Sequence, residues 1–225
     1  MAKRKEQILS TQKTRKPVQE RGIKRRSEIL SAAVQIISET GTTGATAHKI
    51  AERANLPASS VYQYFPKPEM IFEVLAEQRA SDMIEHLKKE FAGRDFDNWW
   101  QMYEIVAKAT CEFYRDDPVN ARLFLGMDAA IIVRLGAASR LTRFAEWFCE
   151  ELESRFIVTD LRGMREPLAI SVNVFDAALS RSISLYGEIR PQYFDEAKEA
   201  VFGYLNARIE RLHSVSAYCL YLGDY

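Results

Sequence analysis

The chain has 225 residues, 47% of them apolar, and a formal net charge of zero at pH 7. A chain of this length can form one or two globular domains with a sizeable core. No stretch reaches the roughly 18 apolar residues that would suggest a membrane span, and the basic N-terminus lacks the apolar segment of a signal peptide. Three scattered cysteines, Cys111, Cys149 and Cys219, predict buried thiols in a reducing cytoplasm rather than a disulfide framework or a metal site.

The zero net charge hides a division along the chain. Residues 1–68 contain 13 Lys or Arg and 5 Asp or Glu, whereas residues 69–225 contain 18 and 26. A basic N-terminal part is typical of a protein that binds a polyanion, and an acidic body is repelled by the same polyanion. We therefore expect the N-terminal part to bind nucleic acid.

Residues 1–20 are polar and rich in lysine and arginine, so they have little apolar surface on which to fold. They predict a disordered basic tail. The alternative is an arm that follows the phosphates or the minor groove beside a DNA site.

Residues 21–40 carry apolar side chains at helical spacing, and Gly41 then predicts the end of a helix. Arg25 and three basic neighbours stand near the start of this helix, where cations oppose the helix dipole. A nearby phosphate would relieve that conflict, so the cluster favours a DNA-facing role. The alternative is a solvated basic face.

Two short helical patterns between Thr46 and Phe65 meet at Asn55. Thr46 can cap the first helix, because its hydroxyl can accept a hydrogen bond from a free backbone N–H of the opening turn. Asn55 tolerates the left-handed conformation that ends a helix, and Pro57 suits the start of the next one. Two short helices joined by a tight turn form a helix-turn-helix, whose second helix enters the DNA major groove.

The stretch from about Arg21 to Leu75 resembles the DNA-binding domain of TetR-type (tetracycline-repressor-like) transcriptional regulators. Four features carry the resemblance through their order and spacing: Ile29-Leu30-x-Ala32-Ala33, Gly41, Thr46-x-x-x-Ile50-Ala51 and Val61-Tyr62-x-Tyr64-Phe65-Pro66. The sequence departs from the family pattern at the turn, where Asn55 replaces the usual Gly, and at Tyr64, a position that His often holds.

The resemblance implies roles for four side chains. Tyr62 and Tyr64 match paired ring positions that typically hydrogen-bond phosphates in the family. His48 matches a position where some members carry a base-contacting Arg, although a lone exposed His is more often simply solvated. Lys67 stands one place before the phosphate-binding lysine of the family, a position that Pro68 occupies here.

The chemistry of the recognition helix adds further candidates. Ser59 and Ser60 are small donors and acceptors that can approach bases or phosphates closely. Gln63 can contact adenine bidentately or can face solvent, whereas Val61 and Phe65 are expected in the core. The residues predicted to bind DNA are Thr46, His48, Ser59, Ser60, Tyr62, Gln63, Tyr64, Lys67 and Arg25.

Residues 69–225 predict a body built of helices, with no strand-like alternation of useful length. Apolar stripes and terminal Gly and Pro residues place the helices at about 69–91, 96–116, 118–135, 141–156, 168–187 and 192–212, with a loop at 161–167. The predicted fold class is therefore all-α, with about nine helices. A three-helix DNA-binding domain at residues 21–68 precedes a helical bundle at residues 69–225.

The body is rich in aromatic residues at helical spacing, which normally form core. A helical body of this size can also enclose an apolar pocket with a few polar groups. The predicted lining residues are Trp100, Tyr103, Phe124, Phe144, Trp147 and Phe175. Asp128 is a candidate polar group for the same pocket or a surface acid, and the rings favour a flat aromatic or apolar ligand.

One short recognition helix contacts too few bases, so we expect two copies of the chain to bind related half-sites. The last two helices, about 168–187 and 192–212, have broad apolar faces that suit a four-helix interface. In the family these helices supply the dimer interface, although packing within one chain explains the same stripes.

Together these features predict a ligand-responsive transcriptional regulator, most readily a repressor. It would bind a palindromic double-stranded DNA operator as a homodimer in the cytoplasm and leave it when a small effector binds. No cofactor, metal or membrane partner is predicted. A body without a cavity would instead favour an architectural DNA-binding protein. A helical enzyme is disfavoured, because the sequence lacks a Gly-rich phosphate loop and a nucleophile elbow.

Overall fold

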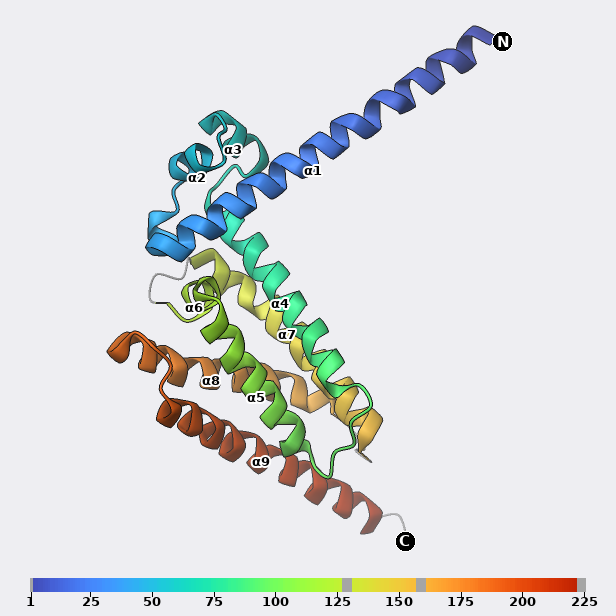
Figure 1. Cartoon of the computed structure of the whole chain (residues 1–225). Helices are drawn as coiled ribbons and strands as arrows, with labels where there is room; N and C mark the ends of the chain where they lie inside the picture. The colour runs from blue at the N-terminus through green and yellow to red at the C-terminus, as the bar shows by residue number, and fades with distance from the viewer. Residues whose placement is uncertain (1, 127–130, 157–160, 222–225) are drawn as a thin grey trace. The chain divides into compact units, whose positions relative to one another are not determined.

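The computed structural model describes the backbone of residues 2–126, 131–156 and 161–221 and, within residues 20–208, most side chains (Figure 1). These parts of the chain contain nine α-helices, one short 3-10 helix and no strand, which confirms the all-α prediction. Internal contacts divide the chain into two compact units, Met1–Ile71 and Phe72–Tyr225. The sequence places this boundary a little earlier, after residue 68.

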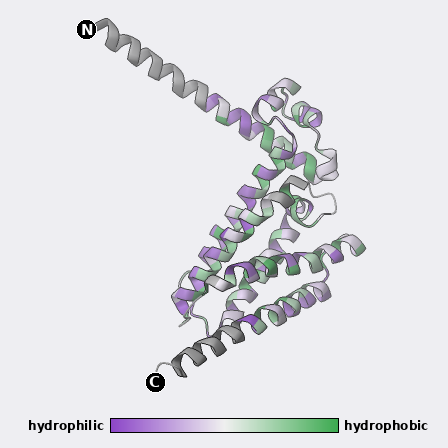
Figure 2. Cartoon of the chain, turned by 180° about the vertical axis from the view of Figure 1, so that it is seen from behind, coloured by the Kyte–Doolittle hydropathy of each residue, from purple (hydrophilic) through white to green (hydrophobic). Residues whose placement is uncertain are grey.

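Figure 1 labels the α-helices. Their bounds, with the 3-10 helix, are α1 (Ala2–Gly44), α2 (Ala47–Arg53), α3 (Ala58–Tyr64), α4 (Glu69–Phe91), α5 (Trp99–Asp116), α6 (Pro118–Phe124), α7 (Ile131–Arg155), η1 (Arg162–Met164), α8 (Arg165–Tyr186) and α9 (Pro191–Tyr221). Where Figure 2 colours the helices by hydropathy, hydrophobic and hydrophilic residues occur on the same helices. This mixture is typical of helices that bury one face and expose the other.

The first unit is held together by apolar side chains from all three of its helices. Ile29 and Ile37 of α1, Ile50 of α2 and Val61 of α3 are fully buried, as is Phe65 just after α3. Each such side chain contributes roughly 1.5–3 kcal/mol when it leaves water. Because α2 and α3 have seven residues each and would be marginal as isolated helices, this shared core holds them in place.

The first helix extends farther back than the sequence predicts. Its backbone is helical from Ala2, through the segment 1–20 for which composition predicts a disordered tail. Lysine, arginine, glutamate and glutamine have high helix propensity, which favours this continuation, although Pro17 removes one backbone donor within it. Gly41 has φ of 77° and ψ of 179°, so the regular helix ends where the sequence predicts.

The second unit has a larger core, built around α5, α7, α8 and α9. α8 packs along both α7 and α9, and α5 packs against α6 and α9. The core contains buried residues from these helices and from α4: Leu87, Phe91, Met102, Tyr103, Phe148, Leu168, Phe175, Leu179, Val201 and Leu205. This apolar frame positions the polar groups that lie inside it.

The middle of the second unit differs from the sequence prediction. The sequence predicts one helix over residues 118–135 and another over 141–156. Instead, α6 ends at Phe124, and α7 runs without a break from Ile131 to Arg155. Gly136, just beyond the predicted end at residue 135, lies inside α7.

The early end of α6 has a local cause. The backbone N–H groups of Leu125 and Gly126 both donate to the carbonyl oxygen of Ala121, which closes the helix in a tight turn. A Cβ added to Gly126 would lie 3.0 Å from the carbonyl oxygen of Arg122. Glycine therefore permits this tight closure, whereas the apolar spacing beyond it suggests that the helix continues.

The start of α8 is also earlier than the sequence predicts. The predicted loop at residues 161–167 is replaced by η1 and by the first turn of α8, which begins at Arg165. Pro167 lies in that first turn, where a helix has no partner for the backbone N–H in any case. The proline therefore does not delay the helix.

By length and composition alone, α8 is long and apolar enough to cross a membrane, which differs from the prediction that no stretch would qualify. Core helices of water-soluble proteins pass the same test. Leu168, Phe175 and Leu179 of α8 are buried, and the helix packs along α7 and α9. Its apolar character is therefore accounted for by the core of the second unit.

Candidate nucleic-acid interface and body cavity

The turn between α2 and α3 is formed by the residues that the sequence singles out. The Thr46 hydroxyl accepts a hydrogen bond from the backbone N–H of Lys49 at 3.4 Å, which caps α2. Asn55 has a φ of 53°, in the left-handed region, and Pro57 directly precedes α3. The predicted cap, turn and helix start are thus confirmed.

α3 presents its polar side chains on the face opposite its buried one. Ser59, Tyr62 and Gln63 are exposed, while Val61 is fully buried. About half of the Tyr62 side chain, 51%, is open to solvent, although a tyrosine of a small domain normally buries most of its ring. The helix therefore offers a hydroxyl, an aromatic ring and an amide to a partner, which is the chemistry that a DNA groove requires.

The other residues predicted to bind DNA lie mostly on the surface of the same unit. Ser60 and Tyr64 are half-buried, and the exposed ones are Thr46, His48, Lys67 and Arg25. DNA contact by any of these side chains remains a prediction.

Tyr64 lies beside α1. A Cβ added to Gly22 would be 4.0 Å from the Tyr64 hydroxyl, and the guanidinium of Arg26 lies 5.4 Å from the centre of the Phe65 ring. These contacts place the basic stretch of α1 against the C-terminal end of α3. Neither the approach of Tyr64 to Gly22 nor the contact between Arg26 and Phe65 is predicted from the sequence, because both depend on tertiary packing.

Two arginines of the first unit are engaged in ion pairs. Arg53 donates two hydrogen bonds of 2.8 Å to the carboxylate of Glu39, and this hydrogen bonding holds the pKa of Glu39 below its usual value. Arg25 lies 3.3 Å from Glu28. Arg53 therefore connects α2 to α1, and Arg25, which is predicted to face DNA, shares its charge with a neighbouring acid.

A cavity of about 520 Å³ lies inside the second unit, walled by α4, α5, α6, α7 and α8. Four of the six aromatic residues predicted to line a pocket are in its wall: Tyr103, Phe124, Phe144 and Phe175. Its size is within the range of roughly 300–1,000 Å³ that small-molecule sites occupy. Ligand binding there remains a prediction.

Trp100 and Trp147 are not in the wall of the cavity, which corrects the predicted lining set. Trp100 stacks on Tyr103 at 5.3 Å between ring centres and meets Phe202 of α9 edge to face at 4.8 Å. Trp147 is buried against Phe91 at 5.3 Å. Helical spacing puts both residues on the inward side of their helices, but it cannot separate a packed ring from one that borders a cavity.

The wall of the cavity includes a carboxyl group that is not among the residues predicted from the sequence. Asp176 of α8 lines it, and Oδ1 of this residue accepts a hydrogen bond of 2.9 Å from the Tyr114 hydroxyl of α5. Burial raises the pKa of Asp176 to about 7, and the Tyr114 hydrogen bond opposes that rise. Burial likewise raises the pKa of Tyr103, and the charge of Asp176 adds to that effect. The sequence signal was a lone acid in the apolar run Val174–Leu179; Asp128, the predicted candidate, lies outside the described residues.

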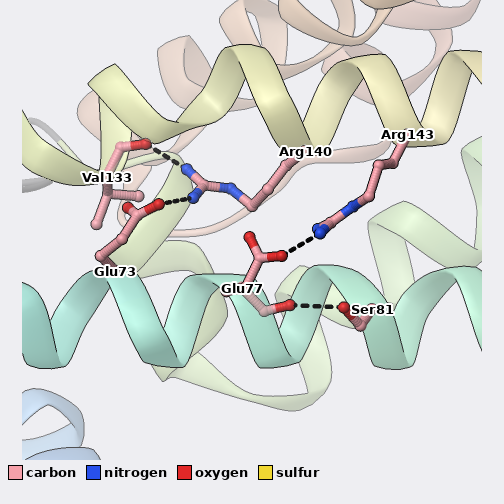
Figure 3. Close-up of polar contacts among 6 residues, drawn as sticks. All are labelled: Glu73, Glu77, Ser81, Val133, Arg140 and Arg143. Carbon is pink, nitrogen blue, oxygen red and sulfur yellow. Dashed lines mark hydrogen bonds and ion pairs between the residues drawn. The ribbon is translucent and has the colours of Figure 1, made fainter.

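Figure 3 shows two acidic residues of α4 facing two arginines of α7. Nη1 of Arg140 lies 2.7 Å from Oε1 of Glu73, and Nη2 of the same arginine donates to the carbonyl of Val133. A second ion pair joins Arg143 to Glu77. α4, which forms one wall of the cavity, is thus attached to α7 beside it.

The ion pair between Glu73 and Arg140 requires a glycine at position 136, and its arginine is part of the cavity wall. Gly136 lies so close to Glu73 that an added Cβ would collide with its carboxylate. Arg140, which is only 5% exposed, also lines the cavity, and its guanidinium lies 6.0 Å from the centre of the Phe124 ring. One side chain therefore belongs both to the cavity wall and to the attachment of α4.

Comparison with known proteins agrees with this arrangement. Residues 29–75 match the family described as bacterial regulatory proteins, tetR family, and residues 97–209 match the tetracyclin repressor-like C-terminal domain. The chain is similar to the nucleoid occlusion factor SlmA of Haemophilus influenzae, with 24% identity over 159 residues, which is 69% of this chain and 70% of SlmA.

Two solved structures have a similar fold. A TetR-family regulator from Streptomyces coelicolor is 19% identical, with a TM-score of 0.64 over 83% of this chain and 98% of that one. RolR in complex with resorcinol is 18% identical, with a TM-score of 0.59 over 86% and 94%. Because the family matches span both units, the chain is a member of the TetR family of DNA-binding transcriptional regulators, which are not enzymes.

Proposed function

We propose that this protein is a ligand-responsive repressor that binds a palindromic operator as a homodimer and releases it when a small, largely apolar effector enters the body. It acts in the cytoplasm, where bacterial DNA is accessible. The observation that carries this proposal is the presence, in one chain, of an exposed helix-turn-helix face and of a separate cavity of about 520 Å³.

In this proposal the first unit binds DNA through two kinds of contact. Tyr62, Tyr64 and Lys67 hold the phosphate backbone, which positions α3 without selecting a sequence. Ser59 and Gln63, both exposed on α3, contact base edges in the major groove and select the operator. The positive charge of residues 1–68 adds affinity that weakens as salt rises.

The homodimer is proposed to form through α8 and α9. Large apolar side chains are exposed on these helices in the single chain, with Ile170 37%, Leu185 48% and Phe202 40% exposed. Such side chains are typical of an interface that a second copy covers. The dimer would present two α3 helices at a spacing of about 34–36 Å or a multiple of it.

The cavity supports an effector rather than a purely architectural role, because its volume of about 520 Å³ is within the range of small-molecule sites. Its aromatic lining from α5, α6, α7 and α8 suits a ring-containing ligand. RolR, whose fold is similar, has resorcinol as its ligand; for this chain an aromatic effector is part of the proposal.

Coupling between effector and DNA is proposed to act through α4, the helix in which the boundary between the units falls. α4 contributes cavity wall, and Glu73 near its start bonds to Arg140, which also lines the cavity. A ligand that contacts Arg140 or Phe124 can therefore favour one position of α4 over another. Only a difference in ligand affinity between the two states shifts their balance, typically by 1–3 kcal/mol.

The test is selection of bound sequences from random DNA with the full-length protein, repeated with a panel of aromatic ligands. We expect a palindromic consensus and a ligand that lowers affinity for it by roughly 5–150-fold. Sedimentation analysis should give a dimer. A monomer that binds no duplex DNA at low salt would refute the proposal.

A further inference from the structure

We propose that the cavity of the second unit takes an apolar, ring-containing ligand with a cationic nitrogen, such as a protonated amine, and that Asp176 accepts a hydrogen bond from that nitrogen. This inference names the effector class of the function proposed above and rests on it. It depends on where the carboxyl group lies, on which charges surround it and on what the rest of the wall offers.

The side chain of Asp176 is part of the cavity wall. The residue lines the cavity from α8, and within the described residues its carboxylate receives one hydrogen bond, from Tyr114 at 2.9 Å. A carboxylate has about four acceptor positions. Its remaining acceptor positions are available to a donor inside the cavity. Ala177, the next residue of α8, and Ser180, one turn later, are small residues of the same wall.

No other described residue of the wall supplies an uncompensated charge. Arg140 of α7 is the one basic residue, and its guanidinium is already bonded to Glu73 and to the Val133 carbonyl. The titratable groups that α5 contributes are Tyr103 and Tyr114, whose pKa values are raised and which are therefore neutral at physiological pH. In the described part of the wall, α4 and α6 contribute only apolar side chains.

The net charge of the cavity wall is therefore that of the Asp176 carboxylate. This negative charge favours cationic ligands over neutral and anionic ones. A buried carboxylate has lost its hydration, and a cation within hydrogen-bond distance replaces it. An anionic ligand would add a second negative charge in the same low-dielectric space, which is strongly unfavourable. A neutral ligand gains at most an ordinary hydrogen bond.

The aromatic wall favours the same ligand class. The rings of Tyr103, Phe124, Phe144 and Phe175 surround the cavity, and aromatic faces attract both flat apolar groups and cations. The guanidinium of Arg140 already lies 6.0 Å from the Phe124 ring centre. A ligand that combines a ring system with an ammonium group would use the rings and the carboxyl together.

Binding of such a cation should depend on pH in one direction. Burial raises the pKa of the free Asp176 carboxyl to about 7, and an ammonium group bound beside it lowers that pKa, because it stabilises the ionised form. Protonation of free Asp176 therefore competes with the ligand. Affinity should be highest near pH 8 and fall by up to about tenfold per pH unit below pH 7.

The test uses three probes that share one ring system: 1-naphthylmethylamine, 1-naphthalenemethanol and 1-naphthoic acid. Their binding to the full-length protein without DNA is measured by isothermal titration calorimetry at pH 8 and pH 6. At pH 8 we expect the amine to bind at least tenfold more tightly than the alcohol, and the acid to bind more weakly than both. The advantage of the amine should shrink at pH 6.

Two variants identify the group responsible. Asp176→Asn keeps the size of the side chain and should bring the amine to the affinity of the alcohol. Tyr114→Phe removes the hydrogen bond that opposes the rise of the Asp176 pKa, so the preference for the amine should remain at high pH and be lost at a higher pH than in the wild-type protein as pH falls. If Asp176→Asn fails to fold by circular dichroism, the pH dependence of the wild-type protein and the Tyr114→Phe variant still test the inference.

Several outcomes would overturn the inference: equal affinity for amine and alcohol, tighter binding of the acid, affinity for the amine that rises as pH falls, an amine preference that survives in a folded Asp176→Asn protein, or binding of no probe at millimolar concentration. DNA binding is measured separately on the selected operator. Selective amine binding by a protein that binds no operator would leave this site assignment standing and refute the proposed repressor function.

Discussion

The helix-turn-helix of the first unit and the cavity of the second hold their candidate functional side chains in opposite surroundings. Ser59, Tyr62 and Gln63 are exposed to solvent on α3. Asp176 is held among apolar walls, and burial raises its pKa to about 7. The proposed DNA contacts of the first unit therefore depend on where these side chains lie, whereas the proposed ligand site of the second unit depends also on the acidity of Asp176.

The two regions also differ in the sequence separation of the residues whose contacts form them. The turn of the first unit depends on a cap from Thr46 to Lys49 and on a single left-handed residue, Asn55. The hydrogen bond between Tyr114 and Asp176 spans 62 residues, and the ion pair between Glu73 and Arg140 spans 67. Damage to the first region should therefore be local, and damage to the second should spread through several helices.

The largest effect is expected from Ile50→Ala, which empties a fully buried site where α2 meets α1 and α3. Truncation of a buried isoleucine costs about 2–5 kcal/mol. Differential scanning calorimetry should show the first unit unfolding at a lower temperature, with operator binding lost. Binding of the naphthyl probes should be unchanged; if the probes are also lost, the two units do not fold as separately as their contacts indicate.

The next largest effect is expected from Gly136→Ala, whose Cβ would displace the Glu73 carboxylate from buried Arg140. Loss of a charge-assisted hydrogen bond to a buried group costs about 1–3 kcal/mol. The matched control is the same change in a Glu73→Ala background, which removes the three atoms nearest to the added Cβ, so alanine should be neutral or stabilising there. Equal melting shifts in both backgrounds would contradict the close contact.

A smaller effect is expected at Asn55, whose φ is 53°. Asn55→Ala should destabilise the first unit by about 1–2 kcal/mol, because a Cβ without a local hydrogen bond is disfavoured in the left-handed region. Asn55→Gly removes that penalty and should leave stability nearly unchanged. Urea unfolding followed by circular dichroism separates the two, and equal midpoints would place the strain elsewhere.

The smallest effects are expected on the exposed face of α3. Tyr62→Phe should weaken binding to operator and random DNA alike, by about 0.5–1.5 kcal/mol, because it removes one phosphate hydrogen bond. Gln63→Ala should instead change preference at one base position. Fluorescence anisotropy on both DNAs measures this, and identical behaviour of the two variants would mean that their assigned roles are wrong.

Local features of the fold could be predicted because they depend on residues close in sequence. The cap at Thr46, the turn at Asn55 and the helix end at Gly41 each follow from the conformational preference of one residue. The end of α6 could not, because the same apolar spacing continues past Gly126, and only the double hydrogen bond to Ala121 marks the break. At Pro167 the sequence predicts a loop where the structure has the first turn of α8. The reason is that a proline in the first turn of a helix cannot be distinguished by sequence from a proline in a loop.

The two candidate sites also differ in how much of them could be predicted from local sequence. The exposure of Tyr62 and Gln63 could be predicted from their order in the helix-turn-helix, because it follows from the position of the buried Val61. In the body, Trp100 and Trp147 have the same helical spacing as Tyr103 and Phe144, yet only the latter two border the cavity. Which ring meets empty space depends on how five helices pack, and no periodicity along one helix contains that information.

Arg140 both lines the cavity and forms the ion pair with Glu73 of α4. This has a consequence for efforts to make biosensors from this protein. A library that varies the cavity to accept new molecules can change Tyr103, Phe144 or Phe175 with the α4–α7 ion pairs left intact. Variation at Arg140 would change the wall that contacts the proposed effector and loosen the Glu73 connection in the same step. Variants there are expected to lose the proposed response to ligand together with the original ligand preference, so that position is best held fixed while the rings are exchanged.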